Sequence, residues 1–418
     1  MSLSSLSQEM IDEIIDILYA SDPDSSHFSS HSLVCQSFRH RTQQHLFRFI
    51  SYHFYKNDSS CLPKLQDRRQ MLEKNPKIAG YVRHLHFVIT GDTLWTFDHP
   101  EFIRMMEIIA QASAQRIDAP LQVLISGGEN PKIPDDFAQH IFEEIGPYVE
   151  TLKLHTIEFM PCRWIADCRN LLKLEMVRVS IAKNDTESTR SRLPRPQELI
   201  LYWPYWPDDS SAAVDYLIKF ALDPSGLHSF QTQFSGNLCL DDIVSIIKAC
   251  SSSLEFLGLW DEQGSALADL FNLSELPNLK VLFLKVDISP DDDDGDDDDD
   301  DNDDDALEDL CALLNTASKD SKIDDILLEI QCESHPDVGP LAHLEMSNWR
   351  MLDSTLVKLS GGRRLKLDIR IYYHFEEEPD MSDSEADPAD RIEAWIAEQL
   401  PVTSRQSHIA LHSEYHGV

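Results

Sequence analysis

Two runs of the sequence, LEFLGL (residues 254–259) and LKVLFL (residues 279–284), have leucine at their first, fourth and sixth positions. In both runs the last two leucines are separated by one residue, a spacing typical of a short β-strand with one buried face. The second run begins 25 residues after the first. The spacing predicts a fold built from a repeated unit that contains one strand.

The same apolar pattern recurs through much of the chain. Its fourth positions, or their equivalents in weaker copies, are Leu85, Leu124, Leu152, Leu174, Leu199, Phe230, Leu257, Leu282, Ile326 and Leu365. From Leu152 to Leu282 the spacing is 22 to 31 residues, and helical patterns lie in residues 208–223, 241–250 and 306–318. One strand and one helix every ~20 to 29 residues resembles a leucine-rich repeat. A conventional α/β domain whose strands begin with leucine stays open as the alternative.

The longest gap in the repeat contains an acidic tract, DDDDGDDDDDDNDDD, at residues 291–305. Leu282 and Ile326 are 44 residues apart, and without these fifteen residues the gap is 29, within the repeat range. Thirteen aspartates repel one another, so the tract is predicted to be a solvated insertion. A second acidic segment, residues 375–390, is predicted to link the last strand to a C-terminal helix and tail, residues 391–418.

The overall charge bears on the kinds of partner that the protein can bind. The 418 residues include 73 Asp and Glu against 36 Lys and Arg, a formal net charge of −37. Such a surface disfavours direct binding to nucleic acid or to anionic lipid. The sequence has no apolar run long enough to span a membrane, no signal peptide pattern and no CxxC pair among its eight cysteines. We therefore expect a protein of the cytoplasm, the nucleus or both.

The first 55 residues differ from the repeats. Apolar residues recur there at helical spacing, and Ser7 is placed to cap the first helix. A second amphipathic run begins near Ser32, so two or three short helices are predicted. So small a bundle buries little surface on its own, and we expect a partner or the rest of the chain to cover its apolar face.

These N-terminal residues resemble the F-box motif. The matching positions, which the resemblance implies contact an adaptor protein, are Leu6, Ile14, Ile15, Leu18, Leu33, Val34, Cys35 and Phe38. With the repeats, the chain resembles F-box proteins that carry divergent leucine-rich repeats, of the kind abundant in fungi. The resemblance implies an α/β fold in which a short helical F-box precedes an irregular solenoid of strand-plus-helix repeats.

The resemblance also implies a function. An F-box attaches to the Skp-type adaptor of a cullin-RING ubiquitin ligase, and the rest of the chain recruits the protein to be ubiquitinated. Two alternatives remain open. In the first, the N-terminal apolar residues cap the first repeat. In the second, the protein is a repeat scaffold whose acidic tract attracts a basic protein such as a histone, with no ligase attached.

The predicted organisation follows from these patterns. It comprises an F-box-like helical domain (1–55), a linker (56–78), a leucine-rich-repeat-like solenoid (79–374) with an insertion at 291–305, an acidic linker (375–390), and a C-terminal helix and tail (391–418).

No catalytic motif is recognisable in the sequence. There is no phosphate-binding GxxxxGK[ST], no GxGxxG and no GxSxG. The pair His27 and His31 lacks further ligands, and Cys162 and Cys168 are too loosely spaced with His155 for a zinc site. We therefore predict no catalytic residue, no metal and no cofactor.

The residues that face away from the buried side of the strands are predicted to form a substrate surface. They are Lys153, His155, Glu175, Tyr202, Trp260, Lys285, Glu329 and Gln331. The aromatic segment YWPYW at residues 202–206 is a further candidate, because aromatic anchors are enriched at interaction hot spots. Ser382 and Ser384 precede acidic residues and are candidates for phosphorylation by an acidophilic kinase.

Overall fold

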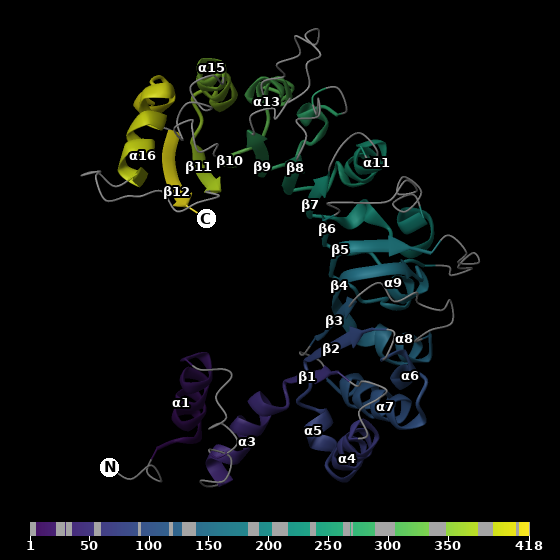
Figure 1. Cartoon of the computed structure of the whole chain (residues 1–418). Helices are drawn as coiled ribbons and strands as arrows, with labels where there is room; N and C mark the ends of the chain where they lie inside the picture. Colours follow the sequence, from purple (N-terminus) through teal and green to yellow (C-terminus); the bar gives the residue numbers. More distant parts are fainter. Residues whose placement is uncertain are drawn as a thin grey trace. The chain divides into compact units, whose positions relative to one another are not determined.

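The chain is a mixed α/β protein that divides into two compact units (Figure 1). Unit 1 comprises residues 1–196 and 216–223, and unit 2 comprises residues 197–215 and 224–418. The computed structural model describes residues 6–21, 30, 36–53, 60–90, 93–116, 120–127, 139–182, 192–202, 216–234, 240–261, 268, 271–288, 306–333, 348–374, 388–406 and 409–417.

Unit 1 contains parallel strands that pair in sequence order. They are β1 (Phe49–Tyr52), β2 (His84–Ile89), β3 (Leu121–Gly127), β4 (Val149–Met160) and β5 (Lys173–Ile181). Its helices are α1 (Gln8–Ser21), α3 (Gln36–Leu46), α4 (Cys61–Lys74), α5 (Pro76–Ala79), α6 (Leu94–Phe97), α7 (Pro100–Ala114), α8 (Gln139–Ile145), η2 (Gly146–Tyr148), α9 (Arg163–Asp167) and η3 (Leu217–Ala221).

Unit 2 repeats this arrangement. Its parallel strands are β6 (Glu198–Tyr202), β7 (Ser229–Phe234), β8 (Phe256–Asp261), β9 (Val281–Ile288), β10 (Asp325–Glu333), β11 (Leu365–His374) and β12 (Ile409–Gly417). Its helices are η4 (Pro224–Gly226), α11 (Leu240–Cys250), η6 (Leu273–Glu275), α13 (Ala306–Asn315), α15 (Trp349–Ser360), α16 (Pro388–Gln399) and η8 (Thr403–Arg405).

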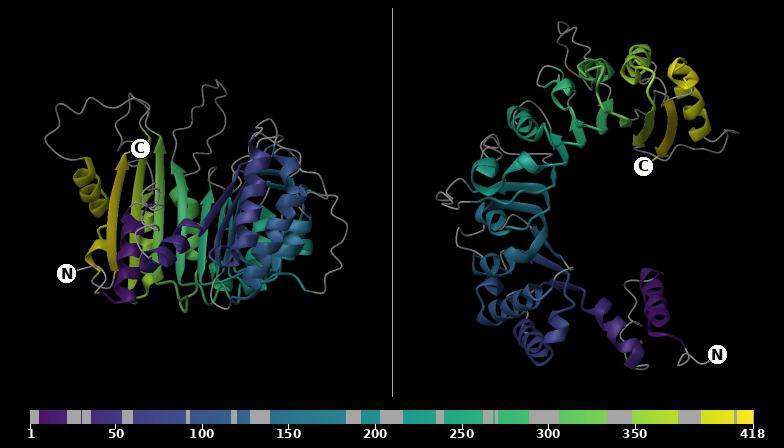
Figure 2. Two further views of the ribbon diagram at one scale, coloured as in Figure 1. Left: turned by 90° about the horizontal axis from the view of Figure 1, so that it is seen from below. Right: turned by 180° about the vertical axis from the view of Figure 1, so that it is seen from behind.

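In each unit the helices cover one face of the strands (Figures 1 and 2). Helices α7, α8 and α9 lie on one side in unit 1, and α11, α13 and α15 do so in unit 2. Strand residues on that side are buried and apolar, as in β2, where Leu85, Phe87 and Ile89 alternate with partly exposed residues. We call the opposite side of the strands the open face of each unit.

A hydrogen-bond ladder aligns the turns that enter successive strands. The Leu172 amide donates to the Glu150 carbonyl, and the Lys280 amide donates to the Glu255 carbonyl, each at 2.8 Å. Two turn asparagines add side-chain bonds: Asn170 donates to the Pro147 carbonyl at 2.6 Å and Asn278 to the Ser252 carbonyl at 2.7 Å. The ladder satisfies backbone groups that the strands leave unpaired at their N-terminal ends.

The predicted strand positions are confirmed, with two changes of register. Each of the ten positions lies within an observed strand from β2 to β11. In β3, however, Val123 rather than Leu124 is paired with Leu152, because Val123 faces the core. In β11, Leu367 rather than Leu365 is paired with Ile326. Strands β1 and β12 were not anticipated.

Most of the predicted helices are confirmed as well. Residues 241–250 form α11, residues 306–315 belong to α13, and the predicted C-terminal helix is α16. Only the end of the 208–223 pattern is described, where η3 is a π-helix. The acidic tract at 291–305, the acidic linker up to residue 387 with Ser382 and Ser384, and the aromatic residues 203–206 lie outside the described residues.

Candidate interaction surfaces

The N-terminal helices α1 and α3 pack against each other as an amphipathic pair. Ser7 caps α1 as predicted, since its hydroxyl accepts a hydrogen bond from the Met10 amide at 3.4 Å. Ile11 and Ile15 of α1 form a small core with Phe38 of α3. Ile15 is 1 % exposed and Phe38 is 7 % exposed, so both serve the contact between the helices.

A carboxylate fixes the two helices together. Asp16 accepts two hydrogen bonds of 2.6 Å from the Arg41 guanidinium, and its carboxylate lies 2.7 Å from His45. The hydrogen bond from Arg41 is the main cause that lowers the pKa of Asp16 to about 2. Tyr19 stacks on the His45 ring, with the ring centroids 4.3 Å apart. This cluster sets the orientation of α1 on α3.

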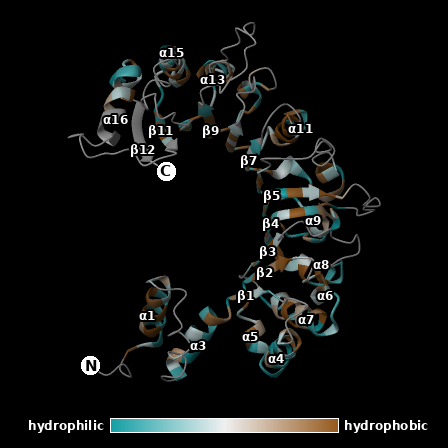
Figure 3. Cartoon of the chain, viewed as in Figure 1, coloured by the Kyte–Doolittle hydropathy of each residue, from teal (hydrophilic) through white to brown (hydrophobic). Residues whose placement is uncertain are grey.

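Part of the apolar face of α1 remains uncovered by the described residues. Met10, Ile17 and Leu18 are 51, 59 and 42 % exposed, and Ile14 between them is half-buried. Their spacing of four, three and one residues places all four on one side of the helix, and Figure 3 colours much of α1 as hydrophobic. We call Met10, Ile14, Ile17 and Leu18 the α1 stripe.

The residues that the F-box resemblance assigned to an adaptor differ in exposure: some lie on the surface and others are buried. Ile14 and Leu18 lie on the α1 stripe, whereas Ile15 and Phe38 are buried and Leu6 packs against their core. Leu33, Val34 and Cys35 lie outside the described residues. Met10 and Ile17 were not predicted as surface residues, although the helical period of the first run places them beside Ile14.

A second surface lies on the open face of unit 2. Strand register places one residue from each of six neighbouring strands in a continuous row, and we call this the β6–β11 row. It consists of Tyr202, Gln233, Trp260, Lys285, Glu329 and Arg370. Four of the predicted substrate-surface residues are therefore neighbours, and Gln331 belongs to the next row, beside Asp287.

Contacts within the row are aromatic at one end and ionic at the other. The Lys285 ammonium lies 3.4 Å from the centroid of the Trp260 ring, a cation–π geometry. The Tyr202 ring meets Trp260 edge-on with centroids 6.5 Å apart. Further along, Arg370 lies 3.7 Å from the Glu329 carboxylate. The Trp260 indole N–H is enclosed and has no hydrogen-bond acceptor among the described residues.

The three predicted residues of unit 1 also meet on its open face. The Glu175 carboxylate lies 2.7 Å from the Lys153 ammonium and 2.9 Å from His155. The hydrogen bond from His155 is the main cause that lowers the pKa of Glu175 to about 2. On the neighbouring strands His86 lies 2.9 Å from the Ser126 hydroxyl, and burial lowers the pKa of His86.

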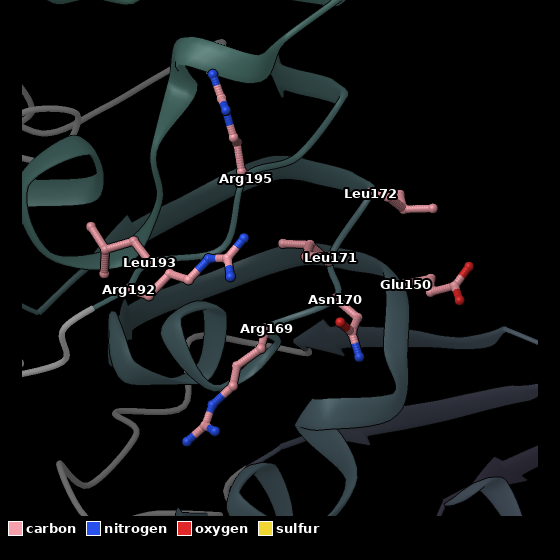
Figure 4. A pocket seen from close by; sticks show the side chains of 8 residues that line it. All are labelled: Glu150, Arg169, Asn170, Leu171, Leu172, Arg192, Leu193 and Arg195. Carbon is pink, nitrogen blue, oxygen red and sulfur yellow. The ribbon is translucent and has the colours of Figure 1, made fainter. Parts of the chain in front are cut away.

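A pocket of about 330 Å³ opens at the N-terminal ends of the unit 1 strands (Figure 4). It is lined by Glu150, Arg169, Asn170, Leu171, Leu172, Arg192, Leu193 and Arg195. The pocket was not predicted from the sequence, because its arginines come from two turns that no motif connects. Among the described residues, no group of three His, Cys, Asp or Glu side chains is arranged to hold a metal ion.

Comparison with known proteins does not assign a family: no protein-family model and no curated protein matches the chain. Within the part of the chain that the structure describes, none of the helices has the length and apolar character needed to cross a membrane.

Proposed function

We propose that the protein is the substrate-recruiting F-box subunit of a cullin-RING ubiquitin ligase. In this proposal the N-terminal helices bind a Skp-type adaptor, which links the chain to the cullin, and the strand-plus-helix repeats form a solenoid that binds a protein substrate. The protein itself has no catalytic role, because the ligase chemistry belongs to the other subunits.

The α1 stripe is the main observation that supports the proposal. Four apolar side chains on one side of a helix form a patch of the kind that marks protein-binding sites. Docking through residues spaced at i, i+4, i+7 and i+8 is a common way for a helix to enter a partner's groove. The bidentate Asp16–Arg41 pair supports the proposal further, because it presents the stripe in a fixed orientation.

The repeats supply the substrate-binding half of the proposal. Each described strand pairs with strands adjacent in the sequence, and turn hydrogen bonds are repeated from one strand to the next. This pattern is expected of a solenoid, whose units contact only their neighbours. The β6–β11 row offers partly exposed Tyr202, Trp260 and Arg370, residue types that are enriched at interaction hot spots, whereas Lys285 is buried beside Trp260.

Affinity purification of the tagged full-length chain from its own cell type, followed by mass spectrometry, tests the proposal. We expect the adaptor and a cullin to copurify with the wild-type chain and to be lost with the Ile17→Asp, Leu18→Asp double variant. Leu62 is a matched control, because it is a partly exposed apolar residue on another helix of unit 1. Leu62→Asp should retain both partners.

Two outcomes would count against the proposal. The first is a wild-type chain that brings down neither adaptor nor cullin. The second is a double variant that retains them as well as the wild type does. Recovery of a basic protein such as a histone in their place would favour the alternative of an acidic scaffold, which the net charge of −37 would suit.

A further inference from the structure

The pocket in unit 1 differs in charge from the chain as a whole. Its lining includes Arg169, Arg192 and Arg195 but one acidic residue, Glu150, so its formal charge is +2. The whole chain has a formal net charge of −37. A local positive charge in so acidic a protein attracts an anion that the rest of the surface repels.

Two of the three arginines have no ion-pair partner among the described residues. Arg169 and Arg192 are exposed and form no described salt bridge. Some other arginines of unit 1 pair closely with carboxylates, as Arg41 does with Asp16 and Arg104 with Glu107, both at 2.6 Å. What distinguishes Arg169 and Arg192 is that both line one pocket, in a chain with twice as many acidic as basic residues.

The rest of the lining indicates the size and character of a ligand. Leu171 is buried and Leu193 is half-buried, so part of the wall is apolar. In Figure 4 the Arg192 side chain extends between these two leucines, and the Glu150 carboxylate stands apart from all three arginines. The volume of about 330 Å³ accommodates more than a single inorganic ion.

We propose that this pocket binds a phosphate monoester. At neutral pH such a group carries about −1.5 to −2 charges, which the lining charge of +2 balances. The guanidinium groups of Arg169 and Arg192 each present two parallel N–H donors that match phosphate oxygens. The leucines contact the carbon side of the ester. The phosphate comes from a phosphorylated side chain of a partner protein or from a small phosphorylated molecule.

This inference is independent of the proposed ligase function. The pocket residues lie in the turns before β5 and β6 and at the start of β4, whereas the proposed adaptor surface is on α1. A chain that fails to bind an adaptor can still bind a phosphate monoester here. Equally, a chain that binds no phosphate monoester can still bind an adaptor, so failure of one test does not imply failure of the other.

Calorimetric titration of the full-length chain tests the proposal with three probes. They are a pentapeptide Ala-Leu-phosphoserine-Leu-Ala with blocked ends, the same peptide without phosphate, and phenyl phosphate. The variants are the Arg169→Gln, Arg192→Gln double variant and Arg192→Lys, which keeps the charge but loses the planar fork. Arg104→Gln is the control, because it removes one exposed positive charge from α7, outside the pocket.

We expect the wild type to bind a phosphorylated probe at least tenfold more tightly than the unphosphorylated peptide. The double variant should lose about tenfold or more of that affinity, since charge-assisted hydrogen bonds are among the stronger ones. Arg192→Lys should lose part of it. Arg104→Gln should stay within about twofold of the wild type, because a charge outside the pocket is screened by salt.

The two phosphorylated probes distinguish the sources of the phosphate. Tighter binding of the phosphopeptide supports a phosphorylated partner protein, whereas equal or tighter binding of phenyl phosphate supports a small molecule. The proposal is overturned if the phosphate confers no preference, or if the double variant, with unchanged circular dichroism and melting temperature, binds as the wild type does. If Arg192→Lys bound the phosphorylated probe as tightly as the wild type does, the planar guanidinium group of Arg192 would not be required for binding.

Discussion

Gly127, the last residue of β3, has no room for a side chain. A Cβ atom at this position would overlap the backbone carbonyl oxygen of Thr156, and Thr156 itself has a positive φ of 55°. We expect Gly127→Ala to lower the free energy of unfolding by about 3 kcal/mol, the cost of forcing extra atoms into a packed site. Urea unfolding followed by circular dichroism measures it.

Gly362 provides the comparison for this prediction. Unlike Gly127, it has a positive φ, 81°, but an added Cβ would meet no atom within 4 Å. Gly362→Ala should therefore cost only the backbone term, about 1 kcal/mol. Equal losses for the two variants would contradict a steric role for Gly127.

Asp16 makes the contact between α1 and α3 sensitive to acid. Its pKa is lowered from the ordinary 3.8 to about 2, mainly by the hydrogen bond from Arg41. A carboxylate with a lowered pKa stabilises the folded state above its ordinary pKa, and this contribution disappears as the pH falls through the folded value. Because Asp16 is partly exposed, the contribution is about 1 kcal/mol at neutral pH.

The measurement compares the unfolding free energies of the wild type and Asp16→Asn from pH 7 to pH 2. We expect a difference of about 1 kcal/mol at pH 6 to 7. It should shrink between about pH 4 and pH 2, because protonation removes the charge that Arg41 binds. A difference that is unchanged at pH 2 would show that the charge of Asp16 is not what holds the helices.

Two isoleucines on helix α1, Ile15 and Ile17, should differ in how much they stabilise the helix pair. Ile15 is buried against Phe38, whereas Ile17 is 59 % exposed. Ile15→Ala should cost about 2 to 4 kcal/mol in the stability of the helix pair. Ile17→Ala should change that stability by less than about 0.5 kcal/mol.

Hydrogen exchange of the α1 amides measures this difference directly. Exchange should become faster in Ile15→Ala and remain near the wild-type rate in Ile17→Ala, because local opening depends on the buried contacts. The assignment of the two faces of α1 would be wrong if the effects were equal or reversed.

The strands were largely predictable, because a buried face imposes a strict alternation on the sequence. The register failed where two apolar residues lie close together: Leu124 was chosen over the adjacent Val123, and Leu365 over Leu367 two residues further on. Strand β12 was missed because IALHSEYHG mixes polar residues into its alternation. Strand β1 was missed because it has four residues, too short to be distinguished from the end of a helix.

The residues of the β6–β11 row and of the pocket were also only partly predictable from the sequence. Tyr202, Trp260, Lys285 and Glu329 were predicted because each directly follows a buried leucine of its strand. Arg370 occupies the equivalent place in β11 and was missed through the register error at Leu365. The pocket arginines were unpredictable, since only the fold brings the turns at residues 169–172 and 192–195 together.

For the whole molecule, the poly-Asp tract contributes 13 of the 37 net negative charges. Removing residues 291–305 takes away thirteen aspartates, which changes the formal net charge from −37 to −37 + 13 = −24. Because self-repulsion falls with the charge, the deletion variant should melt at the same or a slightly higher temperature at low ionic strength. The difference should fade at high salt, where charges are screened.

Thermal melts of both chains at low and high salt, with and without Ca²⁺, test this expectation. The tract lies outside the described residues, so the prediction rests on its composition and on the repeat spacing. A large loss of melting temperature on deletion in the absence of Ca²⁺ would show that the tract belongs to the fold. A loss of stability seen only with Ca²⁺ would indicate that the tract binds the ion.

In the proposed function, the α1 stripe links the whole molecule to its adaptor. The most direct test is the dissociation constant between the full-length chain and a purified Skp-type adaptor, measured for the wild type, Ile17→Asp and the control Leu62→Asp. Loss of a buried apolar anchor costs about 2 kcal/mol or more, so Ile17→Asp should bind at least ~30-fold more weakly. Leu62→Asp should bind as the wild type does. Equal affinities for the wild type and Ile17→Asp, or no binding by the wild type, would contradict the claim.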